Sequence, residues 1–187
     1  MSGWHLPSSV TVSGKTYAVA TDYRDILEII GYLTDENSAV WERLYLSLGL
    51  FYDDFTDLPE SDYKEAYDQM SLFISCGEED DGKPAVKLID WEQDENIIVA
   101  DINKVVGYEV RAVPYLHWWT FIGYFRGIGE GQLSTIVGIR SKLKRGKKLD
   151  KWEKDYYSEH KKVVELRQKY TAEEKAEINR LKEMLDG

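Results

Sequence analysis

The chain has 187 residues and 43% of them are hydrophobic, so it can bury a core and is expected to form one compact domain, with or without an appendage. Its longest apolar runs, such as 97–100, are far shorter than the roughly 20 residues that span a bilayer, and residues 1–10 lack the pattern of a secretory signal. Cys76 is the only cysteine and cannot form an intramolecular disulfide, which fits a reducing cytoplasm. We therefore expect a protein of the cytoplasm that makes no contact with a membrane.

The formal net charge of −10 is unevenly distributed along the chain. Residues 1–110 hold 23 acidic and 7 basic residues, a balance of −16, whereas residues 111–187 hold 11 acidic and 17 basic residues, a balance of +6. The acidic part repels nucleic acid, whereas the basic part can attract either nucleic acid or the acidic part of another copy.

The first third of the chain is expected to form a β-hairpin followed by three helices. The segments 10–12 and 16–19 are rich in β-branched residues and flank a glycine-containing turn, which predicts the hairpin. Asp22 is a typical helix cap, and apolar residues at helical spacing follow it as far as Leu33. The second helix is predicted over 38–48, with 51–59 as a connection. Its expected apolar face comprises Val40, Trp41, Leu44, Tyr45 and Leu48.

Three more helices are predicted in the middle of the chain. Pro59 and Ser61 start the third helix, which ends at Gly77, and the polar run 78–83 after it is the best linker candidate. A fourth helix is expected over 90–106. Pro114 suits the first turn of a fifth helix that ends near residue 127, and a sixth helix is predicted over 133–144.

The chain changes character after Gly146, because the apolar stripe becomes sparse and charged residues dominate. Residues 171–174 read as a capping box that opens a last helix. The sequence therefore predicts a mainly α fold with a compact helical domain over 1–146, which includes the short N-terminal β-hairpin. A basic, charged C-terminal helical hairpin is predicted over 147–187.

No residue pattern predicts a metal site, a cofactor site or a catalytic site. The three histidines, His5, His117 and His160, are far apart, and Cys76 has no ligand nearby. The string 13–16 copies the end of a phosphate-binding loop, but it lacks the earlier glycine and lies in the predicted hairpin. His117 is the only plausible base, and a core histidine with satisfied ring nitrogens is the better interpretation.

The segment 140–154 holds eight basic residues against two acidic ones. Together with Trp152 and Tyr156 it can grip single-stranded nucleic acid by charge and stacking. A solvated helix end explains the same pattern, since basic residues suit the C-terminal end of a helix. The candidate partner-binding residues in this segment are Arg140, Lys144, Arg145, Lys147, Lys148 and Lys151.

The segment 115–125 is the most aromatic stretch of the chain, with six aromatic residues in eleven. It contains the string Leu116-His117-Trp118-Trp119, followed by Phe121. Adjacent tryptophans in a helix point about 100° apart, so they cannot line one narrow stacking groove. We expect at least one of them to belong to the core and the pair to anchor their helix against two neighbours.

This string resembles the most diagnostic motif of a phage family, the tail-assembly chaperone of siphophages and prophages of Gram-positive bacteria, which is encoded next to the tape measure protein. The resemblance covers roughly residues 10–150. Asp22 and Arg24 match the start of the family's first helix, Asp94 lies in its acidic-then-apolar fourth helix, and Arg140 matches an arginine near its end. The family-motif and core candidates are therefore Asp22, Arg24, Asp94, Leu116, His117, Trp118, Trp119 and Phe121.

The resemblance implies a protein without enzymatic activity, which binds the tape measure protein during tail assembly and helps to recruit the major tail (tube) protein. It also implies action in the cytoplasm of the bacterial host and absence from the mature virion. The acidic and basic parts of neighbouring copies have complementary charges that can let the copies associate. A nucleic-acid-binding module that uses 140–154 remains the alternative hypothesis.

Overall fold

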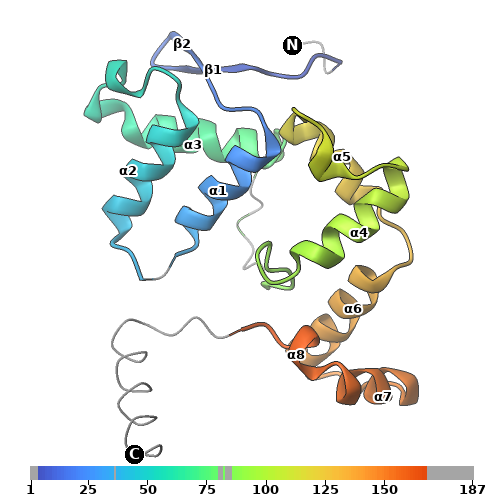
Figure 1. Cartoon of the computed structure of the whole chain (residues 1–187). Coiled ribbons are helices and arrows are strands. Elements are labelled where there is room, and N and C mark those ends of the chain that lie inside the picture. The colour runs from blue at the N-terminus through green and yellow to red at the C-terminus, as the bar shows by residue number, and fades with distance from the viewer. Residues whose placement is uncertain (1–3, 36, 80–81, 83–85, 168–187) are drawn as a thin grey trace, which may run out of the picture.

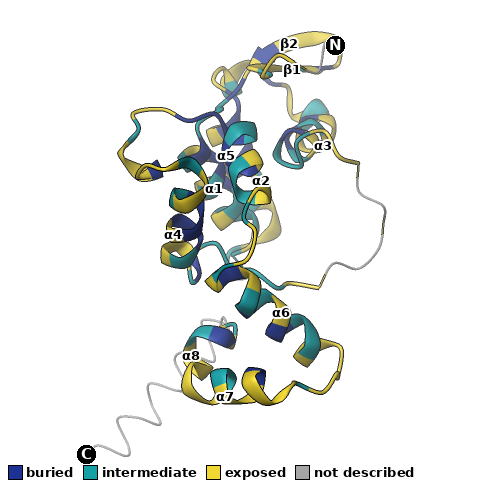
Figure 2. Cartoon of the chain, turned by 90° about the vertical axis from the view of Figure 1, so that its right-hand side faces the viewer, coloured by how far each residue is buried: buried dark blue, intermediate teal, exposed yellow. Residues whose placement is uncertain are grey.

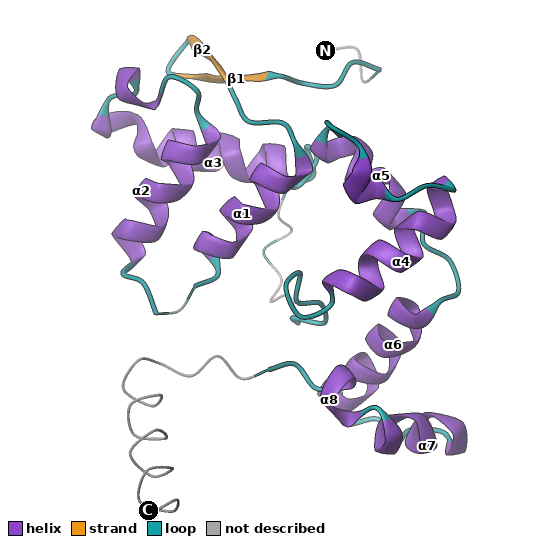
Figure 3. Ribbon diagram, in the orientation of Figure 1, coloured by secondary structure: helices purple, strands orange, loops and turns teal. Residues whose placement is uncertain are grey.

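The computed structural model describes residues 4–35, 37–79, 82 and 86–167. These residues form eight α-helices, three short 3-10 helices and one two-stranded sheet, so the predicted mainly α fold is confirmed (Figure 1, Figure 3). Within this described part, no helix is both long enough and apolar enough to cross a membrane.

The N-terminal hairpin pairs β1 (Ser9–Val12) with β2 (Lys15–Ala18) in an antiparallel register that places Val10 opposite Tyr17. Its two turn residues, Ser13 and Gly14, both have positive φ, as the tight hairpin turn requires. Serine is unusual in this conformation, and its backbone N–H and hydroxyl both donate to the carboxylate of Glu65. The predicted hairpin is thus confirmed, and α3 (Tyr63–Ile74), which carries Glu65, holds its turn in place.

The next two helices form an antiparallel pair. Asp22 caps α1 (Tyr23–Leu33) by accepting a hydrogen bond from the Arg24 backbone, as predicted. The second helix, α2 (Val40–Phe51), runs three residues further than predicted, and Phe51 is a core residue rather than part of a connection. The predicted apolar face of α2 is also wrong in part. Leu44 and Leu48 pack on the core as predicted, whereas Val40, Trp41 and Tyr45 are exposed.

The segment between α2 and α3 contains the 3-10 helices η1 (Phe55–Asp57) and η2 (Glu60–Asp62). Phe55 packs between Tyr45 and Tyr63, with ring centroids 5.0 and 5.6 Å away. The third helix ends three residues before Gly77, whose φ of +82° is accessible to glycine without strain.

The predicted starts of the next two helices are wrong. Residues 91–94 form turns, so α4 (Glu95–Val106) begins after Asp94, and Gly107 ends it in the left-handed conformation as expected. The 3-10 helix η3 (Val110–Ala112) follows, and Pro114 lies in an irregular segment after it. The fifth helix, α5 (Trp118–Arg126), starts four residues after Pro114, because the intervening backbone bonds to the start of α1 instead.

The last described helices are α6 (Gln132–Lys144), α7 (Lys151–Glu159) and the short α8 (Lys161–Val164). The helix predicted from residue 171 lies outside the described residues. Val164 is fully buried against Ile136 and Ile139 of α6, so the segment after Gly146 docks on α6 through a small core of its own. Most of α7 is exposed (Figure 2).

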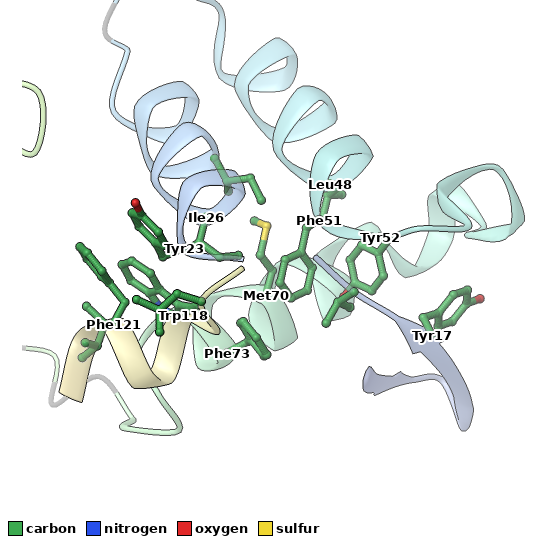
Figure 4. Packing of buried hydrophobic residues seen from close by; sticks show 14 of the residues in the cluster. Tyr17, Tyr23, Ile26, Leu48, Phe51, Tyr52, Met70, Phe73, Trp118 and Phe121 are labelled. Atoms are coloured by element: carbon green, nitrogen blue, oxygen red, sulfur yellow. The ribbon is translucent and has the colours of Figure 1, made fainter. Parts of the chain in front are cut away.

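The main core lies where α1, α2, α3 and α5 meet, and aromatic rings dominate it (Figure 4). Tyr23 of α1 stacks on Phe121 of α5 with ring centroids 4.5 Å apart. Tyr52 follows α2 and donates a buried hydrogen bond from its hydroxyl to the carbonyl of Ala66 in α3, at 2.8 Å. This core fixes the first three helices against α5.

Candidate functional site

The aromatic string at 116–121 joins α5 to the start of α1. Strand-like hydrogen bonds connect the two segments, from the Tyr23 N–H to the Leu116 carbonyl and from the Trp118 N–H to the Thr21 carbonyl, at 3.0 and 2.7 Å. The Asp22 carboxylate, which caps α1, also accepts from the Leu116 N–H at 3.0 Å. One side chain therefore fixes both the start of α1 and the approach to α5.

His117 uses both ring nitrogens in structural hydrogen bonds. Its Nδ1 accepts from the Trp119 backbone N–H at 3.0 Å and thereby caps α5. A nitrogen that accepts carries no proton, so Nε2 holds the proton and donates to the Pro7 carbonyl at 2.9 Å. Neither nitrogen is free to act as a base, and the buried ring also ties the N-terminal segment to α5.

Trp118 and Trp119 hold the end of α3. Their indole N–H groups donate to the carbonyls of Ile74 and Phe73, each at 2.9 Å, and these carbonyls belong to the last turn of that helix. Trp118 is 2% exposed and lies in the core, whereas Trp119 is half-buried. The two expected neighbours are α3, which accepts both hydrogen bonds, and the segment before α4, where Trp91 packs on Trp118 with ring centroids 6.2 Å apart.

Arg24 and Arg140 are far apart in the sequence but make the same kind of contact. Each pairs with an aspartate and also donates hydrogen bonds to backbone carbonyls. Arg24 forms an ion pair with Asp22 and donates to the carbonyl of Val113 at 2.6 Å. Arg140 forms a bidentate pair with Asp94 at 2.6 and 2.9 Å. Both aspartates precede a helix, so each pair connects a helix start to a distant segment.

Arg140 does not belong to a partner-binding surface, contrary to the expectation from its basic neighbours. Its side chain is 3% exposed, and that of Asp94 is 1% exposed. The guanidinium also donates to the carbonyls of Leu88, Val163 and Val164. These contacts bind the segment before α4 and the segment at α8 to α6.

Chemically reactive groups do not gather at one place in the described part of the chain. No group of three or more histidine, cysteine, aspartate or glutamate side chains there is arranged to hold a metal ion. Burial raises the pKa of the Cys76 thiol, which keeps it protonated at neutral pH. The motif residues therefore connect helices to one another, and we expect a binding site among the exposed residues instead.

One candidate surface is the basic segment after Arg140. The cations of this segment are exposed and so accessible to a partner: Lys144, Arg145, Lys147, Lys148 and Lys151. Lys142 differs from these cations because its ammonium group donates hydrogen bonds to Glu153 and Asp150, which raise its pKa. Its charge is therefore already paired within the chain. The described structure places the exposed cations around the end of α6 and the start of α7.

The other candidate surface is a groove between the end of α1, the first half of α2 and the start of α3, with a volume of about 420 Å³. We call it the α2 groove. It is lined by Leu33, Val40, Arg43, Leu44, Tyr63, Lys64 and Tyr67. Trp41 and Tyr45 stand on the same helix beside these residues, and Val40 and Trp41 are 73% and 70% exposed. The groove thus adjoins exposed aromatic and aliphatic side chains.

Arg43 gives this apolar groove one charged group. Its Nη1 donates a long hydrogen bond of 3.4 Å to the Leu33 carbonyl, and its buried Nε has no partner among the described residues. The sequence did not indicate the groove, because the residues on α2 have the spacing of a core-facing stripe. An apolar stripe at helical spacing looks the same whether the chain itself or another molecule covers it.

Comparison with known proteins gives one match. A family model described as "Bacteriophage Gp15 protein" matches residues 4–166, which includes every described helix. No curated protein and no solved structure matches the chain.

Proposed function

The chain belongs to the Bacteriophage Gp15 protein family, and on this premise we propose that it is a tail-assembly chaperone that binds the tape measure protein. The resemblance of the aromatic string at 116–121 to the chaperone motif supports this role. The observation that carries the proposal is the exposed apolar surface at the α2 groove, because a chaperone for a long helical client needs such a surface.

The exposed residues suit a client that presents the apolar side of a helix. Soluble monomers rarely leave large apolar side chains side by side in water, and where they do, the surface commonly binds a partner. An amphipathic helix in a groove contributes anchors at intervals of three to four residues. Val40, Trp41 and Tyr45 are spaced to meet such anchors along about one and a half turns.

Apolar burial supplies the attraction in this arrangement. Covering one large apolar side chain contributes roughly 1.5–3 kcal/mol, so a few exposed residues can hold a client segment without locking it in place. Binding of this strength shields the client from aggregation and still permits release. The tail tube subunits can then displace the chaperone as they assemble around the tape measure protein.

The proposal is tested by co-purification of the tape measure protein with the tagged full chain after co-expression. The Trp41→Ala/Tyr45→Ala variant removes two exposed aromatic side chains and should lower the amount of co-purified client roughly tenfold or more, as expected for loss of aromatic anchors. Trp4→Ala is the matched control, because this tryptophan is also exposed (95%) but lies before β1.

The Trp41→Ala/Tyr45→Ala variant should remain folded, since Trp41 is 70% exposed and Tyr45 is half-exposed. A small fall in melting temperature is expected, because Tyr45 also packs on Phe55. An equal loss of client in the control and in the α2 variant would show that the α2 groove is not the binding surface. Absence of the tape measure protein from the parent's purification would remove the chaperone role itself.

A further inference from the structure

Two exposed surfaces with opposite charge lie outside the α2 groove. We call the first the basic end, and it consists of Leu143, Lys144, Arg145, Lys147, Lys148, Lys151 and Trp152. We call the second the acidic edge, and it consists of Leu46, Leu50, Asp53 and Asp54. Each combines exposed apolar side chains with charges that have no partner among the described residues.

The basic end has charges that the described chain does not neutralise. None of its five cations forms an ion pair or a side-chain hydrogen bond with another described residue, whereas the neighbouring Lys142 has two carboxylate partners. Leu143 and Trp152 are exposed beside these cations. A partner with carboxylates around an apolar contact would complement this surface.

The acidic edge has this complementary composition. Leu46 and Leu50 are one helical turn apart on α2 and are both exposed, and Asp53 and Asp54 follow Tyr52, the residue that ends the helix. No described residue forms an ion pair or a hydrogen bond with either carboxylate. Neither Leu46 nor Leu50 lines the α2 groove, whose α2 residues are Val40, Arg43 and Leu44, so a contact here leaves the groove open.

We propose that the basic end of one copy docks on the acidic edge of a second copy. The two surfaces cannot meet within one chain, because α2 and α7 lie at opposite ends of the molecule (Figure 1). A contact between two different surfaces leaves one of each free on the resulting pair, so it extends into a row of copies unless the rotation between copies closes it into a ring. Successive α2 grooves would then be available along a row.

The charge distribution favours a second copy over nucleic acid as the partner of the basic end. Residues 1–110 carry a balance of −16, from 23 acidic and 7 basic residues, which opposes the approach of a polyphosphate. The same carboxylates attract the basic end of another copy. The docking does not depend on the proposed client, since it needs only the chain itself.

The test measures the average mass of the purified, nuclease-treated full chain by light scattering over a range of concentrations. At low ionic strength the mass should rise with concentration beyond that of a dimer. It should fall towards the monomer at roughly 0.5 M salt, where the screening length is only about 4 Å. A monomer at every concentration, or assemblies that appear only before nuclease treatment, would overturn the proposal.

Charge-reversal variants identify the two surfaces. Lys147→Glu/Lys148→Glu and Asp53→Lys/Asp54→Lys should each remain monomeric, because each change places like charges opposite one another. The variant with all four substitutions restores opposite charges and should assemble again. Glu78→Lys/Glu79→Lys makes the same change in net charge at the other end of α3, and this control should assemble like the parent chain.

Unchanged circular dichroism and melting temperature will confirm that each variant is folded. Failure of the folded fourfold variant to assemble would contradict the pairing of these two surfaces. Equal loss of assembly in the control at 78 and 79 would show that net charge alone governs the association, which would also contradict the proposal.

Discussion

Arg140 shows how one buried side chain can connect several segments. Its guanidinium has five N–H groups, and all five donate: two to the Asp94 carboxylate and three to backbone carbonyls. A buried charge of this kind is tolerated because its partners replace all the hydrogen bonds that water would make. A lysine has only three donors and no planar geometry, so it cannot make the same contacts.

We expect Arg140→Ala to lower the free energy of unfolding by about 3–5 kcal/mol, because it leaves the buried Asp94 carboxylate without its cation. Arg140→Lys should cost nearly as much. Denaturant unfolding followed by circular dichroism measures both. Lys64→Ala is the control, since the ion pair of Lys64 with Asp68 is exposed and should be worth less than about 1 kcal/mol. A loss for Arg140→Ala as small as that of the control would contradict the structural role.

At the scale of elements, α4 and α6 are joined where the backbone at the start of α6 comes close to the side chain of Asp101 in α4. This buried carboxylate accepts from the Leu133 N–H at 2.9 Å and so satisfies a free donor at the start of α6. Gly131 lies beside it, and a Cβ atom added there would be 2.6 Å from the Asp101 Oδ2. Any residue can adopt the extended backbone of Gly131, so glycine is needed here because a side chain would not fit beside Asp101.

Two glycine substitutions should therefore change stability in opposite directions. Gly131→Ala is expected to destabilise the chain by about 1–3 kcal/mol, the usual cost of overpacking. Gly138→Ala, in the middle of α6 with nothing within 4 Å of its Cβ position, should stabilise it by roughly 0.5–1 kcal/mol. Thermal unfolding of both variants gives the comparison. If Gly131→Ala raised the melting temperature as much as Gly138→Ala, the Asp101 side chain would have to move aside without cost, which would contradict this account.

The sequence predicted elements well where local signals set their limits. Asp22 begins α1 and Gly107 ends α4 as expected, since capping side chains and left-handed glycines act on the nearest backbone. The start of α5 could not be predicted in this way. Pro114 is a typical first-turn residue, but backbone bonds to Thr21 and Tyr23 keep the following segment extended, and His117 caps the helix later.

The candidate surfaces were less predictable than the helices. The residues of α2 have the spacing of a core face, and only the tertiary packing shows that Val40, Trp41 and Tyr45 remain exposed. Conversely, Arg140 belongs to a basic run in the sequence, and only the fold brings Asp94 to it from 46 residues away. Both outcomes depend on contacts between distant segments, which local patterns do not encode.

At the scale of the whole molecule, structural and binding residues occupy different places. The aromatic string and the two arginine–aspartate pairs hold helices together in the interior or at their starts. The residues proposed for binding are exposed and lie on α2, shortly after it, and around the end of α6. Variants at these exposed positions should therefore change binding while leaving the folded body intact, which makes binding separable from stability.

The proposed chaperone role is tested most directly by the soluble fraction of the tape measure protein expressed alone, with the parent chain, and with the Trp41→Ala/Tyr45→Ala variant. We predict that the parent chain raises the soluble fraction severalfold and that the variant, at equal expression, does not. A soluble fraction that is the same in all three cultures would contradict the chaperone role.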